Sequence, residues 1–235
     1  MKMRINTSLI LFPMLLGLTL PCRLNAQFTF VTNNGTITIT GYTGSGGDVV
    51  IPDEINGLPV TQLAGGAFHQ CIGLTAIKLG ANVAFFEPGP FTGCSGLKEI
   101  TVDEANSRYA SVDGVLVNKT QTALLQFPGG KEESTYLIPN TVTHINGAAF
   151  CYSLGLTNVV MPPSVRTLGS NSFGFCTNLT RVAIGSNVTN IGIFSFFYCT
   201  ALPSVTIPDS VQSIGGNAFG VCTSLTNVVI GRRVS

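Results

Sequence analysis

Apolar residues recur along this chain at a fixed interval. The pattern Phe-x-x-Cys-x-x-Leu occurs five times, and a sixth copy carries serine in the cysteine position. Successive phenylalanines of these copies are separated by 23, 59, 23, 23 and 23 residues. The copies are Phe68-Cys71-Leu74, Phe91-Cys94-Leu97, Phe150-Ser153-Leu156, Phe173-Cys176-Leu179, Phe196-Cys199-Leu202 and Phe219-Cys222-Leu225. A unit of this length cannot bury its own apolar side, so the pattern predicts coils that stack into a solenoid and share one core.

Each unit also predicts a short strand and a turn. After the leucine, apolar and polar residues alternate, as from Arg181 to Ile184, which is typical of a strand with one buried face. A turn containing proline, glycine or asparagine follows, as at Pro208, and a second apolar pair comes next. These second pairs are Val142/Ile145, Val165/Leu168, Val188/Ile191 and Val211/Ile214. We expect them to face the same core as the motif residues.

The spacing of 59 residues marks an insertion at about residues 103–136. Its apolar stretches at 109–117 and 123–127 predict two strands joined around Asn118, as in a hairpin on the flank of the solenoid. Residues 27–66 are interpreted as a β-rich leading or capping segment, and residues 67–235 as the solenoid.

The last residues printed, from Ile230 to Ser235, begin the turn of another unit. Solenoids usually end in a polar capping unit, because a bare coil exposes apolar side chains and strand edges. We therefore expect a truncated sequence, or else a partner that covers this end.

Residues 1–26 have the pattern of an export signal. Lys2 and Arg4 precede an apolar run of 13 residues from Ser8 to Leu20, and Ala26 is a small residue just before a cleavage point. Thirteen residues are too few to span a hydrocarbon core about 30 Å thick. Cys22 leaves a lipidated N-terminus as an alternative, although Pro21 fits it poorly. The prediction is a secreted or cell-surface protein without a transmembrane span in the mature chain.

Composition and charge narrow the class of partner. Hydrophobic residues make up 45% of the chain and charged residues 10%, and the formal net charge is +1. Without residues 1–26, nine basic residues face eleven acidic ones. This balance shows no basic bias toward nucleic acid, so we expect no nucleic-acid partner.

Several stretches resemble one known family. The runs CTSLTNVVIGRRV, NAFGVCTSL and IPDSVQSIGGNAF look like the leucine-rich repeats of the BspA-like (LRR_5) family of secreted and surface proteins. The leading segment TITITGYTGSGGDVVIPDEINGLPVTQLAGGAF and the stretch NSRYASVDGVLVNKTQTALLQFPGG are similar to further family features. The resemblance implies an α/β horseshoe-type leucine-rich-repeat solenoid, right-handed and mostly β, with short helical or 3₁₀ bends. It also implies a role in adhesion or protein recognition, and neither a catalytic residue nor a cofactor.

The cysteines admit two interpretations. Six remain after removal of residues 1–26, and an exported chain with six cysteines suggests three disulfides. Five of them, however, share one position of the repeat, where leucine-rich repeats hold a buried ladder. Side chains in such a ladder point in parallel into the core, so we favour buried free thiols. Cys151 lies off the register and is expected to be exposed. No CxxC pair or histidine cluster supports a zinc site.

The chain offers few candidate catalytic residues, and we expect its function to lie on the outward side of the strands. His69 and His144 are interpreted as tolerated repeat variants rather than catalytic bases, and no catalytic, metal or cofactor site is predicted. The candidate binding face consists of Lys78, Glu99, Thr101, Asn158, Arg181, Ser204 and Asn227. A rival contact site on the insertion consists of Arg108, Tyr109, Lys119 and Lys131. The hypothesis is recognition of an extracellular or cell-surface protein or glycan, with a structural spacer as the alternative.

Overall fold

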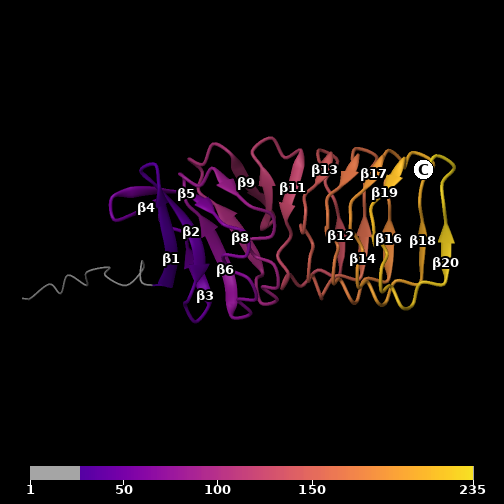
Figure 1. Ribbon diagram of the computed structural model, residues 1–235, viewed down its shortest axis with the longest axis horizontal. Helices are drawn as coiled ribbons and strands as arrows, with labels where there is room; N and C mark the ends of the chain where they lie inside the picture. The colour runs from indigo at the N-terminus through magenta and orange to yellow at the C-terminus, as the bar shows by residue number, and fades with distance from the viewer. Residues whose placement is uncertain (1–26, 235) are drawn as a thin grey trace, which may run out of the picture.

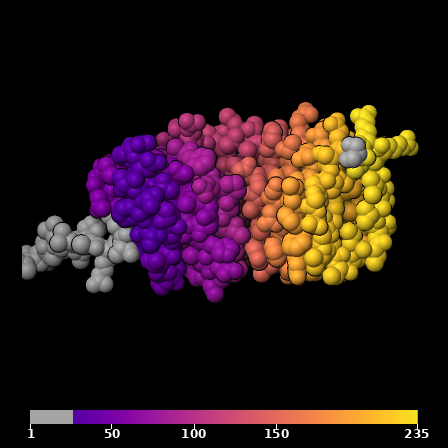
Figure 2. Space-filling view, in the orientation of Figure 1, coloured from indigo at the N-terminus to yellow at the C-terminus, as the bar shows by residue number. Residues whose placement is uncertain are grey.

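The computed structural model describes residues 27–234, which form an elongated solenoid (Figure 1). The coils follow one another along the long axis in sequence order, and in the space-filling view they appear as successive bands (Figure 2). The elements assigned within these residues are all strands. The export signal predicted for residues 1–26, with Cys22, lies outside the described residues.

The leading segment covers the N-terminal end of the core. A hairpin of β1 (Phe28–Asn33) and β2 (Thr36–Tyr42) turns at Asn34 and Gly35, both of which have positive φ, as a two-residue Asn-Gly turn requires. Strand β2 continues in parallel to β5 (Leu58–Leu63), which also pairs with β4 (Glu54–Ile55) and β7 (Phe85–Phe86). The hairpin stacks the ring of Tyr42 on that of Phe68, with centroids 5.3 Å apart.

Two rows of parallel strands run along the solenoid. The first row is made of three separate sheets: β3 (Gly47–Val50), β6 (Leu74–Leu79) and β8 (Glu99–Val102); β12 (Thr135–Leu137), β14 (Asn158–Val160) and β16 (Arg181–Ala183); β18 (Ser204–Thr206) and β20 (Asn227–Val229). The second row contains β13 (His144–Ile145), β15 (Thr167–Leu168), β17 (Asn190–Ile191) and β19 (Ser213–Ile214). Paired residues of β3 and β6 are 27 or 28 positions apart, and those of the other strands in the two rows are 23 apart, as at Asn158 and Arg181, so equivalent positions of successive units lie side by side.

The insertion is part of the second row. The stretch expected as one strand at 109–117 is divided into β9 (Tyr109–Val112) and β10 (Val115–Asn118), because Asp113 and Gly114 adopt positive φ and reverse the chain. Strand β11 (Ala123–Gln126) follows and pairs in parallel with β13. Leu116 and Leu124 are fully buried, so this segment contributes to the core instead of projecting from the flank.

A ladder of phenylalanines fills the core. The rings of Phe150 and Phe173 stack with centroids 4.6 Å apart, those of Phe173 and Phe196 at 5.1 Å, and those of Phe196 and Phe219 at 5.1 Å. Phe127, which lies 23 residues before Phe150, extends the ladder at 5.1 Å and restores the period that the insertion interrupts.

Most of the expected core residues are buried. Among the residues of the Phe-x-x-Cys-x-x-Leu motif, three are only partly buried: Cys71, Phe219 and Leu225. They belong to the first and last copies of the motif, where a second motif coil lies on one side only.

The bends are turns rather than helices. Each closes with hydrogen bonds between residues three apart, such as Cys176 N–H to the carbonyl of Phe173 at 3.3 Å and Leu179 N–H to that of Cys176 at 3.0 Å. Carbonyls of the next coil accept from other N–H groups of the bend, so a single turn suffices at each bend and no continuous helix is needed. The helical bends implied by the family resemblance are not observed in residues 28–234. Nor do the described residues contain a helix with the length and apolarity needed to cross a bilayer.

Candidate functional site

The outward side chains of the first row form one surface, called here the strand face. In β16, Arg181 and Ala183 are exposed while Val182 between them is 9% exposed and packs in the core. Strands β14 and β18 likewise bury their middle residue, Val159 and Val205, whereas all three residues of β20 are exposed. The candidate residues on this surface are Lys78 and Glu99, which are exposed, Thr101 and Asn158, which are half-buried, and Arg181, Ser204 and Asn227, which are exposed.

Charge is unevenly distributed along the strand face. At its N-terminal part Lys78 is paired with Asp103 at 3.1 Å, and the N–H of Ala105 together with Lys78 lowers the pKa of the Asp103 carboxyl. Residues 27–133 contain five basic and ten acidic residues, whereas residues 134–234 contain four basic and one acidic. The C-terminal half is therefore positive, and Arg181 is the charged side chain of its strand face.

The first row is interrupted between β16 and β18. Three other units carry threonine just before the strand, and its N–H donates to the previous coil: Thr157 to Ser134 O at 2.8 Å, Thr180 to Thr157 O at 2.9 Å and Thr226 to Pro203 O at 3.0 Å. The fourth unit has Pro203, which has no N–H to donate. The two strands belong to separate sheets, and no donor within residues 27–234 meets the carbonyl of Thr180.

A cleft of about 350 Å³ opens at this interruption. Its walls include Arg181, Ala183, Ser204 and Thr206 from the outward positions of the two strands. No ion pair or hydrogen bond holds the Arg181 guanidinium within the described residues, so its donors face solvent. Arg181 and Ser204 are among the residues predicted from the sequence, whereas Pro203 is not. Pro203 could have been found from the sequence, because it replaces the threonine that the neighbouring units carry at this position.

The cysteines form a ladder of thiols that donate to main-chain carbonyls. Cys94, Cys176, Cys199 and Cys222 each direct Sγ to the oxygen of the phenylalanine 26 residues earlier, at 2.9, 3.0, 3.2 and 3.1 Å. Burial raises the pKa of the Cys94 thiol to about 12 and also raises the pKa values of Cys176 and Cys199. The six cysteines of the described residues are free, which confirms the prediction from the repeat register.

The expectation that Cys151 is exposed is wrong. Its side chain is 2% exposed, and the amide of Asn171 in the next coil donates to its sulfur at 3.1 Å. Burial raises the pKa of this thiol to about 11. The hydroxyl of Ser153, which stands in the cysteine position, has no hydrogen-bond partner among residues 27–234. The carbonyl that would accept from it, that of Phe127, instead accepts from Gln126 Nε2 at 3.0 Å.

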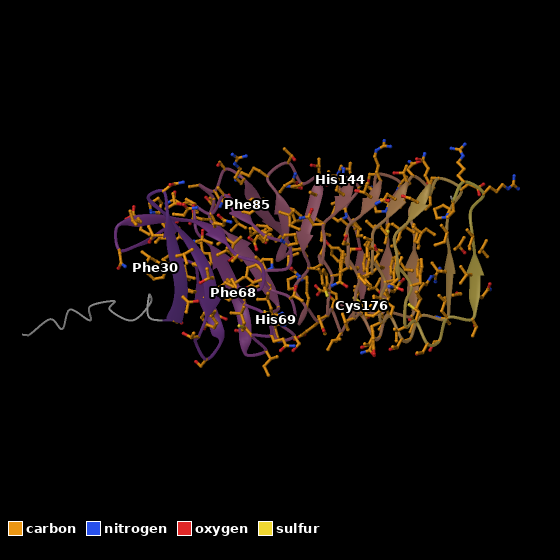
Figure 3. All side chains as sticks on the ribbon, in the orientation of Figure 1. Phe30, Phe68, His69, Phe85, His144 and Cys176 are labelled. Carbon is orange, nitrogen blue, oxygen red and sulfur yellow. The ribbon has the colours of Figure 1, made fainter. Side chains whose placement is uncertain are left out.

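The histidines and the insertion offer little to a reaction or a partner. His69 and His144 are exposed and lie on opposite edges of the solenoid (Figure 3). Tyr109 donates its hydroxyl to the carbonyl of Ala84 at 3.1 Å, and Lys119 donates to that of Asn106 at 2.7 Å. Lys131, with 14% of its side chain exposed, pairs with Glu133 at 2.9 Å. Arg108 is exposed. No group of three potential metal ligands occurs within residues 27–234.

A model of the BspA-type leucine-rich repeat region matches residues 48–112 and 129–235 in six copies. The chain belongs to the BspA-type leucine-rich repeat family. In this BspA-type protein, the unmatched residues 113–128 hold β10 and β11, where the insertion joins the second row. No curated protein sequence matches the chain.

Solved structures of leucine-rich repeat proteins are similar to this BspA-type solenoid. A protein from Bacteroides ovatus aligns with a TM-score of 0.54 and 20% identity, over 88% of this chain and 53% of that one. The pneumococcal vaccine antigen PcpA aligns with a TM-score of 0.50 and 14% identity, over 86% and 84%. The T. pallidum protein TpLRR is 26% identical over 87% and 80%, with a TM-score of 0.46. The likeness to the Bacteroides ovatus protein shows the leucine-rich-repeat fold.

Proposed function

We propose that this protein is an exported recognition module, which binds a protein or glycan at the cell surface or outside the cell through its strand face. The observation that supports this proposal most directly is the surface itself. Parallel strands of successive units hold outward side chains at a regular spacing on a rigid core, and such a surface is the usual binding site of a solenoid. The pattern of residues 1–26 supports export.

The proposal assigns no catalytic step to this chain. Its histidines lie apart, and the buried thiols donate to carbonyls and have raised pKa values, which is unfavourable for a nucleophile that must ionise. The insertion is a weaker contact site than the strand face, because Tyr109, Lys119 and Lys131 already make contacts within the solenoid.

The test is a binding assay on an array of extracellular-matrix proteins, cell-surface proteins and glycans. A strand-face variant replaces Lys78, Glu99, Asn158, Arg181 and Asn227 by alanine. A matched control replaces five exposed residues away from this face by alanine: Glu54, His69, His144, Arg166 and Asn190.

We expect the unaltered chain and the control to bind the same array members and the strand-face variant to lose them. Retention of binding by the strand-face variant would contradict the proposal. Failure of the unaltered chain to bind any member would favour the spacer hypothesis instead.

A further inference from the structure

The bends in the C-terminal half of the solenoid carry a cluster of aromatic side chains that reaches the surface. This cluster, called here the aromatic edge, consists of Tyr152, Phe175, Ile193, Phe194, Phe197 and Tyr198. We propose that it is the contact surface of a homodimer, in which the aromatic edges of two copies pack against each other about a two-fold axis. The inference goes beyond the proposed function, because it concerns the bends rather than the strand face.

The rings of the aromatic edge hold one another in place. Phe175 stacks on Tyr152 and on Tyr198, with ring centroids 4.6 and 5.2 Å apart and ring planes within 16° of parallel. Phe197 meets Phe194 and Tyr198 edge to face, both at 5.1 Å. Rings that are already fixed lose little side-chain entropy when a partner covers them, which favours their use in a contact surface.

One unit carries most of the exposed apolar surface. Its residues Ile193, Phe194 and Tyr198 are exposed, and Phe197 is half-buried. At the positions of Ile193, Phe194 and Phe197, the preceding unit has serine, asparagine and glycine, and the following unit has glycine, asparagine and glycine. The repeat therefore folds without these side chains, and a contiguous apolar patch of this kind marks a contact site.

Phe194 is also held in an unfavourable main-chain conformation. Its φ is 57°, in the left-handed region, and the other units have glycine, alanine or asparagine at this position. A bulky residue is strained there, whereas glycine and asparagine are tolerated. Strain and exposure of the same aromatic residue are both unfavourable in an isolated chain. This combination is expected where a partner covers the residue.

The bends around the aromatic edge are uncharged. They span residues 145–154, 168–179, 191–202 and 214–225. Their sequences contain neither acidic residues nor lysine, arginine or histidine, whereas the equivalent bends of the first two units contain His69 and Glu87. Near a two-fold axis each residue approaches its own copy, so a charge there would meet a like charge. The absence of charge removes this penalty for a second copy and provides no attraction for an ionic ligand.

The apolar area of the edge matches that of an ordinary dimer contact. Ile193, Phe194 and Tyr198 are 50, 39 and 40% exposed, which at about 200 Å² per large side chain leaves about 250 Å² open. Val221, at the ladder position after Tyr198, and Leu154 bring the open area to about 400 Å². A standard interface buries about 800 Å² per partner, and somewhat more than half of this area is apolar. Two aromatic edges therefore supply most of the apolar part of such a contact.

The repeat makes the edge complementary to a copy of itself. Tyr152, Phe175 and Tyr198 occupy equivalent positions of successive coils, so their outer edges form a regular row. Two such rows can pack side by side over their whole length. A dimer of this kind joins two strand faces, and a ligand with repeated sites would bind it with greater avidity than one copy.

The experiment is sedimentation-velocity analysis of the full chain. Two edge variants introduce residues that other units carry at the same positions. Ile193→Ser combined with Phe194→Asn copies the preceding unit, and Tyr198→Gln copies the first unit. The matched control, Leu137→Asn combined with Val229→Ser, removes two aliphatic side chains of the strand face that are more exposed than those of the aromatic edge.

We expect the unaltered chain and the control to sediment as dimers at about 50 μM. Each edge variant should raise the dissociation constant at least about 100-fold, because each substitution removes a contact residue from both copies. The urea midpoint of the double variant, measured on monomers at low concentration, should stay close to that of the unaltered chain, since asparagine relieves the strain at position 194. Loss of the dimer would then not reflect unfolding.

Three results would overturn the inference: a monomer at about 50 μM, a dimer that a folded edge variant retains, or a dimer that the control also loses. Binding of a monomeric chain to phosphatidylcholine vesicles, abolished in the edge variants, would assign the edge to a membrane surface and would also overturn it. The array assay separates this failure from failure of the proposed function. A monomer whose strand-face variant loses array binding would refute only the dimer.

Discussion

The phenylalanine ladder predicts that replacing one of its rings by alanine lowers the free energy of unfolding by an amount that depends on the position of its coil. Phe173 is fully buried and stacks on Phe150 and Phe196, with ring centroids at 4.6 and 5.1 Å. Phe219 has the same place in its unit but is partly buried and stacks on Phe196 alone. Replacement of each by alanine removes the same atoms, so the two variants differ mainly in the number of neighbouring coils that they disturb.

The expected magnitudes follow from these contacts. A buried phenylalanine replaced by alanine costs about 3–5 kcal/mol, and a stacked ring pair contributes about 0.5–1.5 kcal/mol beyond its area. We therefore expect Phe173→Ala to lower the free energy of unfolding by about 4 kcal/mol and Phe219→Ala to lower it by about 2 kcal/mol. With a urea m-value of about 3 kcal/mol/M, the midpoints fall by about 1.3 M and 0.7 M.

Urea unfolding provides the measurement. Circular dichroism follows the strands and tyrosine fluorescence follows the packing, since the chain has no tryptophan. Agreement of the two probes justifies a single free energy for each variant. Equal midpoint shifts for Phe173→Ala and Phe219→Ala would refute the reasoning, because they would mean that the second neighbouring coil contributes nothing.

Three further predictions concern the open edge and the thiols. By hydrogen exchange, the amide of Ile184 should exchange at least about tenfold faster than that of Ile207, which donates across its junction; equal rates would mean that the ladder is closed. With Cys22 replaced by serine, one thiol of the native chain, that of Cys71, should react rapidly with a disulfide reagent, because it is more exposed than Cys176; rapid reaction of several thiols would contradict the buried ladder. Burial raises the pKa values of the ladder thiols in the folded state, so their contribution to the free energy of unfolding is complete below their unfolded pKa of about 8.5 and is lost above it. The free energy of unfolding should therefore fall between pH 8 and pH 10, by up to about 1.4 kcal/mol per pH unit for each thiol that ionises on unfolding. A constant unfolding midpoint over that pH range would argue against thiols that are buried and un-ionised in the folded protein.

The sequence by itself determined the architecture, because in a solenoid each position meets copies of itself. A residue 23 places along the chain is also the neighbour in the next coil, so periodicity in the sequence becomes contact in space. The burial of Phe173 and Val182 and the outward direction of Arg181 follow from period and alternation alone. These features needed no knowledge of distant contacts.

Other features depended on which main-chain groups meet across coils, and the sequence pattern does not state that. The thiol of Cys176 reaches the carbonyl of Phe150, whereas Ser153 finds the equivalent carbonyl occupied by Gln126. Cys151 is buried because Asn171 of the next coil covers it. Each outcome is set by a partner that lies outside the 23-residue spacing.

The open edge at Pro203 likewise has one part that the sequence determines and one part that tertiary contacts determine. The residue type was visible in the sequence, and the loss of one N–H donor follows from its chemistry. Whether the two coils would move apart, or keep their separation and leave a cleft, was decided by the bonds at the bend and in the second row. Periodicity therefore determined where the strands lie, and tertiary hydrogen bonding decided that β16 and β18 stay neighbours although no ladder of hydrogen bonds joins them.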